Sequence, residues 1–316
     1  MSMENLQLST IIINWNTREM LQACLDSVFA HSEGLAFEVI VVDNASDDGS
    51  ADMVADTFPA VRLIRNTRNV GFAAANNQGF AIASGRHVLL LNSDTIVHGD
   101  VLKKSVEWLD MHPKVAAMGC RVLNTDGTVQ NTCSMYPSLL NQILLTSGLS
   151  RLPWPRFLGR YQMADWKRDV EREVEVISGC YLLVRKSVID EIGPLDEAFF
   201  FFGEETDWCK RMRDAGWSLM FAPVGEITHH GGGSVKKLND KRDVMLSEAI
   251  IRLHRKHSGY VGAMMVFLVI MLFNGSRAIF WSLTNTLASS TRAQERSRHF
   301  RAVFCQSLDT WPGRSQ

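Results

Sequence analysis

The sequence has little cysteine and lacks the patterns that mark several classes of protein. Its six cysteines in 316 residues stand apart, with no CxxC pair and no zinc-ligand spacing. We therefore expect reduced thiols, without a disulfide framework or a zinc site. Residues 1–7 are polar and contain no apolar signal-peptide core, so we expect the protein to stay in the cytoplasm.

Two glycine-rich phosphate-binding patterns are also missing. The first apolar segment, residues 8–14, leads into Asn14-Trp-Asn-Thr-Arg18 without the glycines of a Rossmann dinucleotide-binding turn. No GxxxxGK[ST] occurs, which excludes a P-loop enzyme. A nucleotidylyltransferase would carry a glycine-rich, basic loop near its N-terminus, and none is present. The net charge of −1 removes a general electrostatic case for binding nucleic acid.

Composition and periodicity predict a large α/β domain with an appendage. Hydrophobic residues make up 46% and charged residues 21%, a globular balance, and 316 residues exceed the usual single-domain size. Short apolar runs alternate with segments of helical periodicity, and we predict strands at 8–14, 37–43, 61–64 and 87–91. This alternation predicts a parallel sheet with helices on both faces.

Asparagine or aspartate follows every one of these strands. The residues are Asn14, Asp43 with Asn44, Asn66 with Asn69, and Asn92 with Asp94. Ligands of such sheets bind beyond the carboxyl ends of the strands, so these side chains predict a binding site. Asparagine and aspartate also favour turns, which would account for any one of the clusters alone.

Six motifs occur in a fixed order between residue 8 and about residue 235. They are VVDNASDDGS (41–50), RNTRNVGFAAANNQG (65–79), LLLNSD (89–94), SGCYLLVR (178–185), FGEETD (202–207) and HHGGGS (229–234). Together they resemble family 2 glycosyltransferases with the GT-A fold, and most closely the rhamnosyltransferase branch. The resemblance implies a Rossmann-like mixed sheet flanked by helices, and inverting transfer of a sugar from a nucleotide-sugar to a hydroxyl group.

The resemblance implies a metal site. Releasing a diphosphate calls for a divalent cation, and a hard ion such as Mg²⁺ or Mn²⁺ takes oxygen ligands and few protein carboxylates. Asp94 corresponds to the last residue of the family's DxD motif, and His229 to the histidine that joins it at the metal. Asn92 replaces the first aspartate and adds no charge. A plain strand-ending turn at Asn92-Ser-Asp94 is the alternative.

In the family, the aspartate at position 43 accepts the ring N–H of uracil or thymine, which implies nucleobase recognition here. Gly71 lets the backbone approach a phosphate, and the helix after it directs its positive end at an anion. Many relatives carry an arginine where this chain has Asn76, so a direct charge on the diphosphate is missing there. The full nucleotide-sugar set that we expect is Asn14, Asp43, Asn44, Asn69, Gly71, Asn76, Asn77, Asn92 and Asp94.

The catalytic base is expected in Glu204-Glu205-Thr-Asp207, which follows the aromatic run 199–202. A base must remove the acceptor proton, and a carboxylate among aromatic rings and other carboxylates should have a raised pKa. The family's base is the second member of an acidic pair, which corresponds to Glu205. Glutamate replaces aspartate there, so Glu204 remains a rival, with Asp207 included in the catalytic set. Acidic residues also favour the first turn of a helix.

The chain becomes basic from residue 236 and then apolar. Residues 260–273 carry no charge, and we expect the helix to break at Asn274-Gly-Ser. A spanning helix needs ~20 residues, so we predict a shallow hairpin on the inner face of the cell membrane. A helix buried against the catalytic domain is the alternative. We divide the chain into a catalytic domain, 1–235 (donor half 8–110, acceptor half 111–235), and a helical region, 236–316.

By resemblance the expected donor is dTDP-rhamnose, and the expected acceptor is a glycan or polyprenyl-linked sugar of a cell-surface polysaccharide. UDP-linked donors carrying galactofuranose, glucose or N-acetylglucosamine remain open. In relatives the glycine at position 179 keeps space for the acceptor, although close strand packing explains a glycine equally well. The departures at Asn76, Asn92 and Glu205 keep a second hypothesis open, an inactive nucleotide-sugar-binding or scaffold protein.

Overall fold

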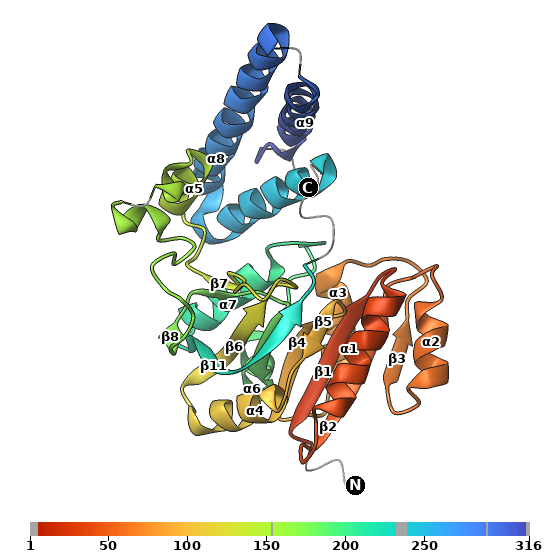
Figure 1. Ribbon diagram of the computed structural model, residues 1–316. Helices are drawn as coiled ribbons and strands as arrows, with labels where there is room; N and C mark the ends of the chain where they lie inside the picture. Colours follow the sequence, from red (N-terminus) through yellow and green to blue (C-terminus); the bar gives the residue numbers. More distant parts are fainter. Residues whose placement is uncertain (1–5, 153, 232–238, 289, 314–316) are drawn as a thin grey trace. The chain divides into compact units, whose positions relative to one another are not determined.

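The computed structural model describes residues 6–152, 154–231, 239–288 and 290–313 (Figure 1). Predictions for residues 1–5, for 232–234 of the HHGGGS motif and for Lys236 and Lys237 lie outside this part. The described chain forms two compact units. One contains residues 1–135, 166–200 and 204–232, and the other contains 136–165, 201–203 and 233–316. Residues 136–165 therefore group with the C-terminal helices, although we placed them in the acceptor half.

The first unit holds one large sheet and its helices. Its elements are β1 (Leu8–Asn14), α1 (Arg18–Ala30), β2 (Phe37–Asp43), α2 (Ser50–Thr57), β3 (Arg62–Arg65), α3 (Phe72–Ile82), β4 (His87–Asn92), β5 (Thr95–Val97), α4 (Val101–Met111), β6 (Val115–Leu123), β7 (Cys133–Ser134), β8 (Arg172–Glu173), β9 (Val176–Ile177), β10 (Tyr181–Arg185), α6 (Lys186–Ile192), α7 (Glu204–Asp214) and β11 (Ser218–His229).

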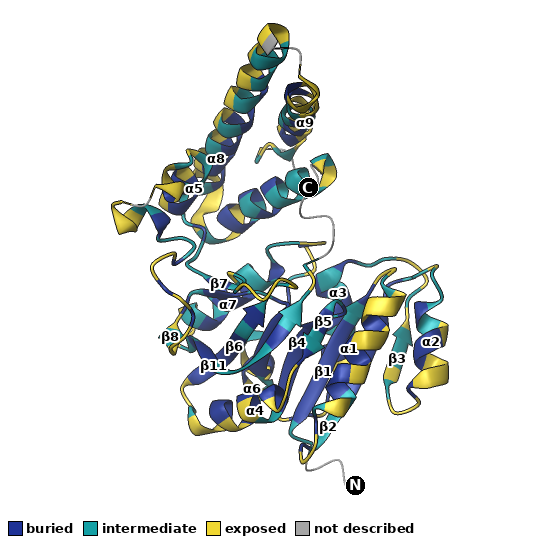
Figure 2. Ribbon diagram, in the orientation of Figure 1, coloured by how far each residue is buried: buried dark blue, intermediate teal, exposed yellow. Residues whose placement is uncertain are grey.

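The sheet has the strand order β3-β2-β1-β4-β10-β6-β11-β5, with β8 beside β11. Strands β3, β2, β1 and β4 are parallel, whereas β10 runs antiparallel to both β4 and β6. The sheet is therefore mixed and flanked by helices, which confirms the fold class. Its central strands are buried on both faces, as the dark blue ribbons of Figure 2 show. This burial explains their continuous apolar runs.

Strand register brings the polar strand ends together. Asn14 pairs with Asp43 across β1 and β2, and Asn92 pairs with Ile13, one residue before Asn14. Helix α1 packs on the sheet through Leu21, Cys24, Leu25 and Val28, which recur at helical spacing and are fully buried. The carboxyl ends of β1, β2 and β4 therefore form one polar edge next to a buried apolar core.

Residues 174–184 contribute two strands, β9 and β10, which a turn at 178–180 divides. In this turn the Cys180 carbonyl accepts the N–H of Asn92 (3.3 Å). Helix α7 ends at Asp214, and Ala215 beyond its end is exposed.

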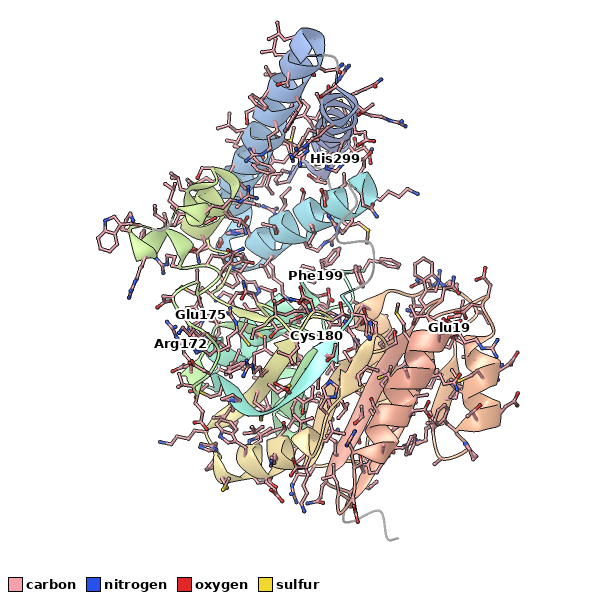
Figure 3. All side chains as sticks on the ribbon, in the orientation of Figure 1. Glu19, Arg172, Glu175, Cys180, Phe199 and His299 are labelled. Carbon is pink, nitrogen blue, oxygen red and sulfur yellow. The ribbon has the colours of Figure 1, made fainter. Side chains whose placement is uncertain are left out.

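The second unit is helical. It contains α5 (Leu139–Thr146), the short 3-10 helices η2 (Leu149–Arg151) and η3 (Arg156–Gly159), α8 (Asp240–Ala288), α9 (Thr291–Ser307) and η4 (Leu308–Thr310). His299 on α9, labelled in Figure 3, binds the start of α8. Its Nδ1 bonds to Asp240 and its Nε2 lies 3.1 Å from Asp243 Oδ2. These contacts join α9 to the N-terminal end of α8.

The expected helix break at Asn274-Gly-Ser is wrong. Helix α8 continues through it, because Asn274 is buried and Gly275 lets the Phe304 ring of α9 approach to 3.0 Å from where a Cβ would stand. The kink lies at Gly259 instead, with φ 69°, a conformation that glycine adopts without strain. Among the described residues, α8 alone is long and apolar enough to cross a membrane by length and composition.

Candidate active site

The loops that follow β1 and β2 interlock through short polar side chains. Asn14 Nδ2 donates to Asp43 Oδ1 (2.9 Å) and to Ser46 Oγ (3.0 Å), and the Ser46 N–H donates to Asp43 Oδ2 (3.0 Å). Asp43 is only 3% exposed. Its carboxylate is therefore fixed in direction, and each oxygen keeps one further lone pair for a ligand donor.

Two of the expected binding asparagines shape a loop. Asn44 Nδ2 donates to the Gly71 carbonyl (3.1 Å), and Asn69 Oδ1 accepts the Gly71 N–H (2.9 Å). Gly71 itself has φ 88°, and a Cβ there would stand 2.5 Å from the carbonyl oxygen of Phe200. That carbonyl accepts the N–H of Phe72 (2.8 Å), the first residue of α3. Gly71 is thus required by a protein contact, whatever ligand approaches it.

Asn76 and Asn77 have different surroundings on α3. Asn77 binds the main chain of Leu195 through both ends of its amide, at 2.9 and 3.0 Å, and also contacts Glu197. Asn76 is buried and donates to the Phe72 carbonyl (2.9 Å), and its Oδ1 has no hydrogen-bond partner among the described residues. Asn77 therefore holds a loop, whereas Asn76 keeps one acceptor for a ligand.

Asn92, Asp94 and His229 come together at the end of β4. Strands β5 and β11 pair antiparallel, with His229 opposite Thr95, and the His230 N–H donates to the Asp94 carbonyl (2.9 Å). His229 Nε2 consequently lies 3.1 Å from Asp94 Oδ1 and 3.2 Å from Asn92 Nδ2. Residues that are 135 positions apart in the chain (94 and 229) thus form one cluster.

The donor set of this cluster suits a hard or borderline divalent cation. No group of three or more His, Cys, Asp or Glu side chains able to hold a metal occurs in the described part of the chain. The protein would therefore contribute two ligands, one carboxylate oxygen and one imidazole nitrogen. Mg²⁺ and Mn²⁺ sites that also bind substrate phosphates need few protein ligands, so the residues present fit such an ion.

Glu204 and Glu205 open α7 as two adjacent carboxyl groups. Each has one buried carboxyl oxygen without a hydrogen-bond partner among the described residues. Burial, and then the negative charge of Glu205, raise the pKa of Glu204 well above its ordinary value, and burial also raises the pKa of Glu205. Two carboxyls in this position hold a proton more readily than exposed ones, as a group that accepts a proton near neutral pH must.

The acidic pair and the cluster of Asn92, Asp94 and His229 both lie near the buried thiol of Cys180. Burial raises the pKa of Cys180, labelled in Figure 3, to about 12, and the charges of Asp94 and Glu205 add to this effect. Both carboxylates are therefore within electrostatic range of one side chain in the turn between β9 and β10. Direct contacts agree with this: the Asn92 N–H at the end of β4 donates to the Cys180 carbonyl (3.3 Å), and the Cys209 thiol of α7 donates to the Ile177 carbonyl (3.9 Å).

A family model described as "Glycosyl transferase family 2" matches residues 9–193, more than half of the chain. The chain belongs to this family. The resemblance stated from its motifs is confirmed.

This family 2 chain is similar to curated relatives and solved structures of the same kind. It is 27% identical over 206 residues to the N-acetylglucosaminyl-diphospho-decaprenol L-rhamnosyltransferase of Mycobacterium tuberculosis (strain ATCC 25618 / H37Rv), covering 61% of this chain and 66% of that protein. It is 26% identical over 239 residues to the O-antigen biosynthesis protein RfbC of Myxococcus xanthus, covering 71% and 17%. The chain thus spans just under two thirds of the first relative's length and much less of the second.

Among solved structures, the mannosyltransferase PcManGT from Pyrobaculum calidifontis, in complex with GDP-Man and Mn²⁺, aligns with a TM-score of 0.57 and 15% identity, covering 98% of this chain and 89% of that one. GalNAc-T7 with UDP, GalNAc and Mn²⁺ aligns with a TM-score of 0.54 and 14% identity, covering 80% and 54%. At these identities the likeness shows the fold of this family 2 chain and nothing finer.

Asp207 and Gly179 have structural explanations in this family 2 protein. Asp207 is fully buried and pairs with Arg211 (2.8 Å), which also donates to the carbonyls of Ile192 and Pro194. This favours an anchoring role over the catalytic one that its motif suggested. At Gly179, a Cβ would stand 3.3 Å from the Phe72 ring, a tight contact, so packing by itself favours a small residue there.

Two residues at the site were missed from the sequence. Gln130 contacts both the ring and the carbonyl of His229, at 2.9 and 2.8 Å. Trp15 directly follows Asn14 and is 57% exposed, at the same end of the sheet as Asp43. A tryptophan directly after an apolar run was a usable signal, whereas nothing near Gln130 in the sequence pointed to a histidine 99 residues away.

Proposed function

We propose that this protein is an inverting glycosyltransferase that moves a hexose from a nucleotide-sugar to a hydroxyl of a glycan or polyprenyl-linked acceptor. The observation that carries the proposal is that the Asp94–His229 pair at the end of β4 and the Glu204–Glu205 pair at the start of α7 belong to elements that both contact segment 177–180. One pair suits a cation beside a diphosphate, and the other suits proton removal from an acceptor. Inverting transfer needs both at one site.

Each group has a distinct task in this proposal. Glu205 accepts the acceptor proton as the hydroxyl oxygen attacks the anomeric carbon, while the more buried Glu204 keeps its own proton. Asp94 and His229 would hold Mg²⁺ or Mn²⁺, which supplies charge neutralisation for the departing diphosphate. Asp43 receives the nucleobase, with the exposed indole of Trp15 as a stacking face.

The relatives' names support a narrower donor and acceptor. A rhamnosyltransferase acting on a decaprenol-linked sugar and an O-antigen biosynthesis protein are both similar to this chain. We therefore propose rhamnose from dTDP-rhamnose as the donor sugar, in polysaccharide synthesis. The direct test is release of nucleoside diphosphate from a panel of dTDP- and UDP-sugars with Mn²⁺ and a polyprenyl-linked acceptor. Binding without release from any donor would favour the inactive, scaffold alternative.

Replacing Asp43 should change nucleotide recognition selectively. Asp43→Ala removes the acceptor for the ring N–H of uracil or thymine, so binding of UDP and dTDP should weaken about tenfold or more, as for a charge-assisted hydrogen bond. Pyrophosphate, which has no base, should bind as before. Calorimetric titration of both ligands checks this, with Asp47→Ala in the same loop as the matched control. Equal losses for nucleotide and pyrophosphate would make Asp43 structural.

The second unit supports a membrane-bound acceptor. One face of α8 after Gly259 packs inside the unit through Val266, Phe267 and Ile270, whereas the other face exposes a row of apolar side chains. This row contains Val261, Met265, Leu268, Leu272, Ile279, Phe280, Leu283 and Leu287. The segment 149–157 adds an exposed Trp154 (77%) between Arg151 and Arg156. A helix that is apolar on both faces, with basic residues and an aromatic residue nearby, fits an anionic lipid surface.

We therefore propose that the second unit holds the protein on the inner face of the membrane. Replacing Leu272, Leu283 and Leu287 by glutamate should abolish binding to phosphatidylglycerol vesicles. Burying a leucine is worth about 1.5–3 kcal/mol, so each change should weaken binding about tenfold or more. Vesicle flotation of the full-length protein measures this, with exposed Met111→Glu on α4 as control. Unchanged flotation of the triple variant, or no flotation of the wild type, would contradict the membrane assignment.

A further inference from the structure

Gln130 contacts His229 through both ends of its side-chain amide. Gln130 Nε2 donates to the His229 carbonyl oxygen (2.8 Å), and Gln130 Oε1 lies 2.9 Å from His229 Nδ1. The first contact fixes the direction of the amide, because a carbonyl oxygen only accepts and must face the NH₂ end. The amide oxygen is therefore the atom that faces the imidazole ring.

This geometry determines where the imidazole proton lies. An amide oxygen also only accepts, so Nδ1 of His229 must carry the hydrogen. In neutral imidazole the other nitrogen then has the lone pair. Asn92 Nδ2, a donor, lies 3.2 Å from Nε2 and satisfies that lone pair. The tautomer therefore rests on the Gln130 contacts, with Asn92 as a second donor at Nε2. Asp94 Oδ1, 3.1 Å from the same nitrogen, only accepts, so the Nε2 lone pair and the carboxylate oxygen face each other as two ligand atoms that a cation between them would join.

The sheet fixes the position of Gln130. Its N–H donates to the Val122 carbonyl (2.8 Å), and Val129 forms a bridge with Leu123, so this segment runs back along β6. Strand β6 in turn pairs with β11, with Leu123 opposite Thr228. Gln130 and His229 are therefore attached to adjacent strands, and their contact follows from the strand register.

We infer that Gln130 is a positioning residue that holds His229 in the Nδ1–H tautomer and directs the Nε2 lone pair toward Asp94. The inference deepens the proposed function, since the cation at Asp94 and His229 rests on that proposal. Free histidine favours the opposite tautomer, which would place a hydrogen where a cation must bind. Partners that orient a ligating histidine through its second nitrogen are worth about 10–100-fold in metal affinity.

The test uses the full-length protein labelled with ¹⁵N-histidine, metal-free and at a pH where imidazoles are neutral. Long-range ¹H–¹⁵N correlation spectra report the tautomer of each ring, and His229→Gln assigns the His229 signals. Gln130→Met keeps length but removes both contacts, whereas Gln130→Glu keeps an acceptor at Nδ1. Gln22→Met, on the exposed face of α1, is the matched control, and His98, which bonds to Thr228, is the internal reference.

We expect Nδ1–H in the wild type and in Gln130→Glu, and loss of that tautomer in Gln130→Met with His98 unchanged. Mn²⁺ binding, followed by electron paramagnetic resonance, should weaken about 10–100-fold in Gln130→Met only. Retention of the Nδ1–H tautomer in Gln130→Met overturns the inference. A changed tautomer in a protein whose wild type binds no Mn²⁺ leaves the role of Gln130 at His229 standing and overturns the metal site of the proposed function.

Discussion

Glu205→Gln should lower turnover by about 10²–10⁴-fold, the range typical of losing a general base, while donor binding persists. Glutamine keeps the size of the side chain but cannot accept the acceptor proton. The raised pKa of Glu205 comes from burial, against which the hydrogen bond from Glu204 acts, and this surrounding would remain in the variant. Steady-state transfer to a soluble acceptor analogue measures turnover, and calorimetric titration measures donor binding.

The neighbouring Glu204 is the sharpest control. Its pKa is raised well above the ordinary value by burial and by Glu205. In this proposal Glu204 therefore stays protonated and does not act as the base. Glu204→Gln removes a group that is already neutral and should cost far less turnover than Glu205→Gln. Glu107→Gln, on the exposed face of α4, controls for loss of a carboxyl elsewhere. If Glu204→Gln proves the more damaging change, the base is Glu204.

The same pair sets the direction of the pH dependence. A base works only when deprotonated, and burial raises the pKa of Glu205 above that of an ordinary glutamate. Turnover should therefore rise with pH through an apparent pKa above the ordinary 4.5. In mildly acidic buffer, where an exposed carboxylate would still be ionised, the protein should lose activity. In Glu205→Gln this acidic limb should disappear from the residual rate.

Asp94→Ala should abolish detectable transfer and the response to divalent cations. Asp94 Oδ1 is the only carboxylate oxygen placed within 3.1 Å of His229 Nε2 among the ion pairs of the described residues. Its removal leaves one neutral protein ligand, which cannot hold a hard cation against water. Chelation of the wild type should have the same effect and be reversed by Mn²⁺. The measurement is diphosphate release across a Mn²⁺ titration.

Asp100 provides the matched control for this change. It lies six positions after Asp94, is exposed, and pairs with Lys104 on α4 (2.9 Å). Exposed pairs of this kind contribute little to stability, so Asp100→Ala should leave metal dependence intact. Full activity of the wild type in excess chelator would rule out the cation and leave Asp94 a structural partner of His229.

The polar edge of the sheet was predictable, because it follows from local patterns. Apolar runs such as 8–14 and 37–43 specify parallel strands, and the asparagine or aspartate at each end then lies at one edge. The pairing of Asp94 with His229 needed the family resemblance, since no local signal links the two. The role of Gln130 could not be predicted from the sequence, because it depends on the register of β6 against β11 and on an isolated bridge.

The C-terminal helix shows why a local glycine can mislead. Asn274-Gly-Ser has the composition of a turn, yet Gly275 is the place where Phe304 packs closely, and Asn274 is buried in the helix. The sequence around Gly259 is less typical of a turn, yet Gly259 takes the positive φ that bends the chain. Tertiary packing decided both, and packing partners some 30 residues away are not visible in a helical pattern (275 and 304).

The contact between Phe72 and Phe200 limits how this site can change during evolution. The contact uses main-chain atoms of residues 72 and 200, and it leaves no room for a side chain at position 71. Phe200 itself is 52% exposed, and its identity is not needed for the hydrogen bond. Position 71 therefore accepts only glycine, whereas the side chain at position 200 can be replaced. Side-chain changes at residue 200 can thus accumulate while the main-chain join between the two loops is inherited unchanged.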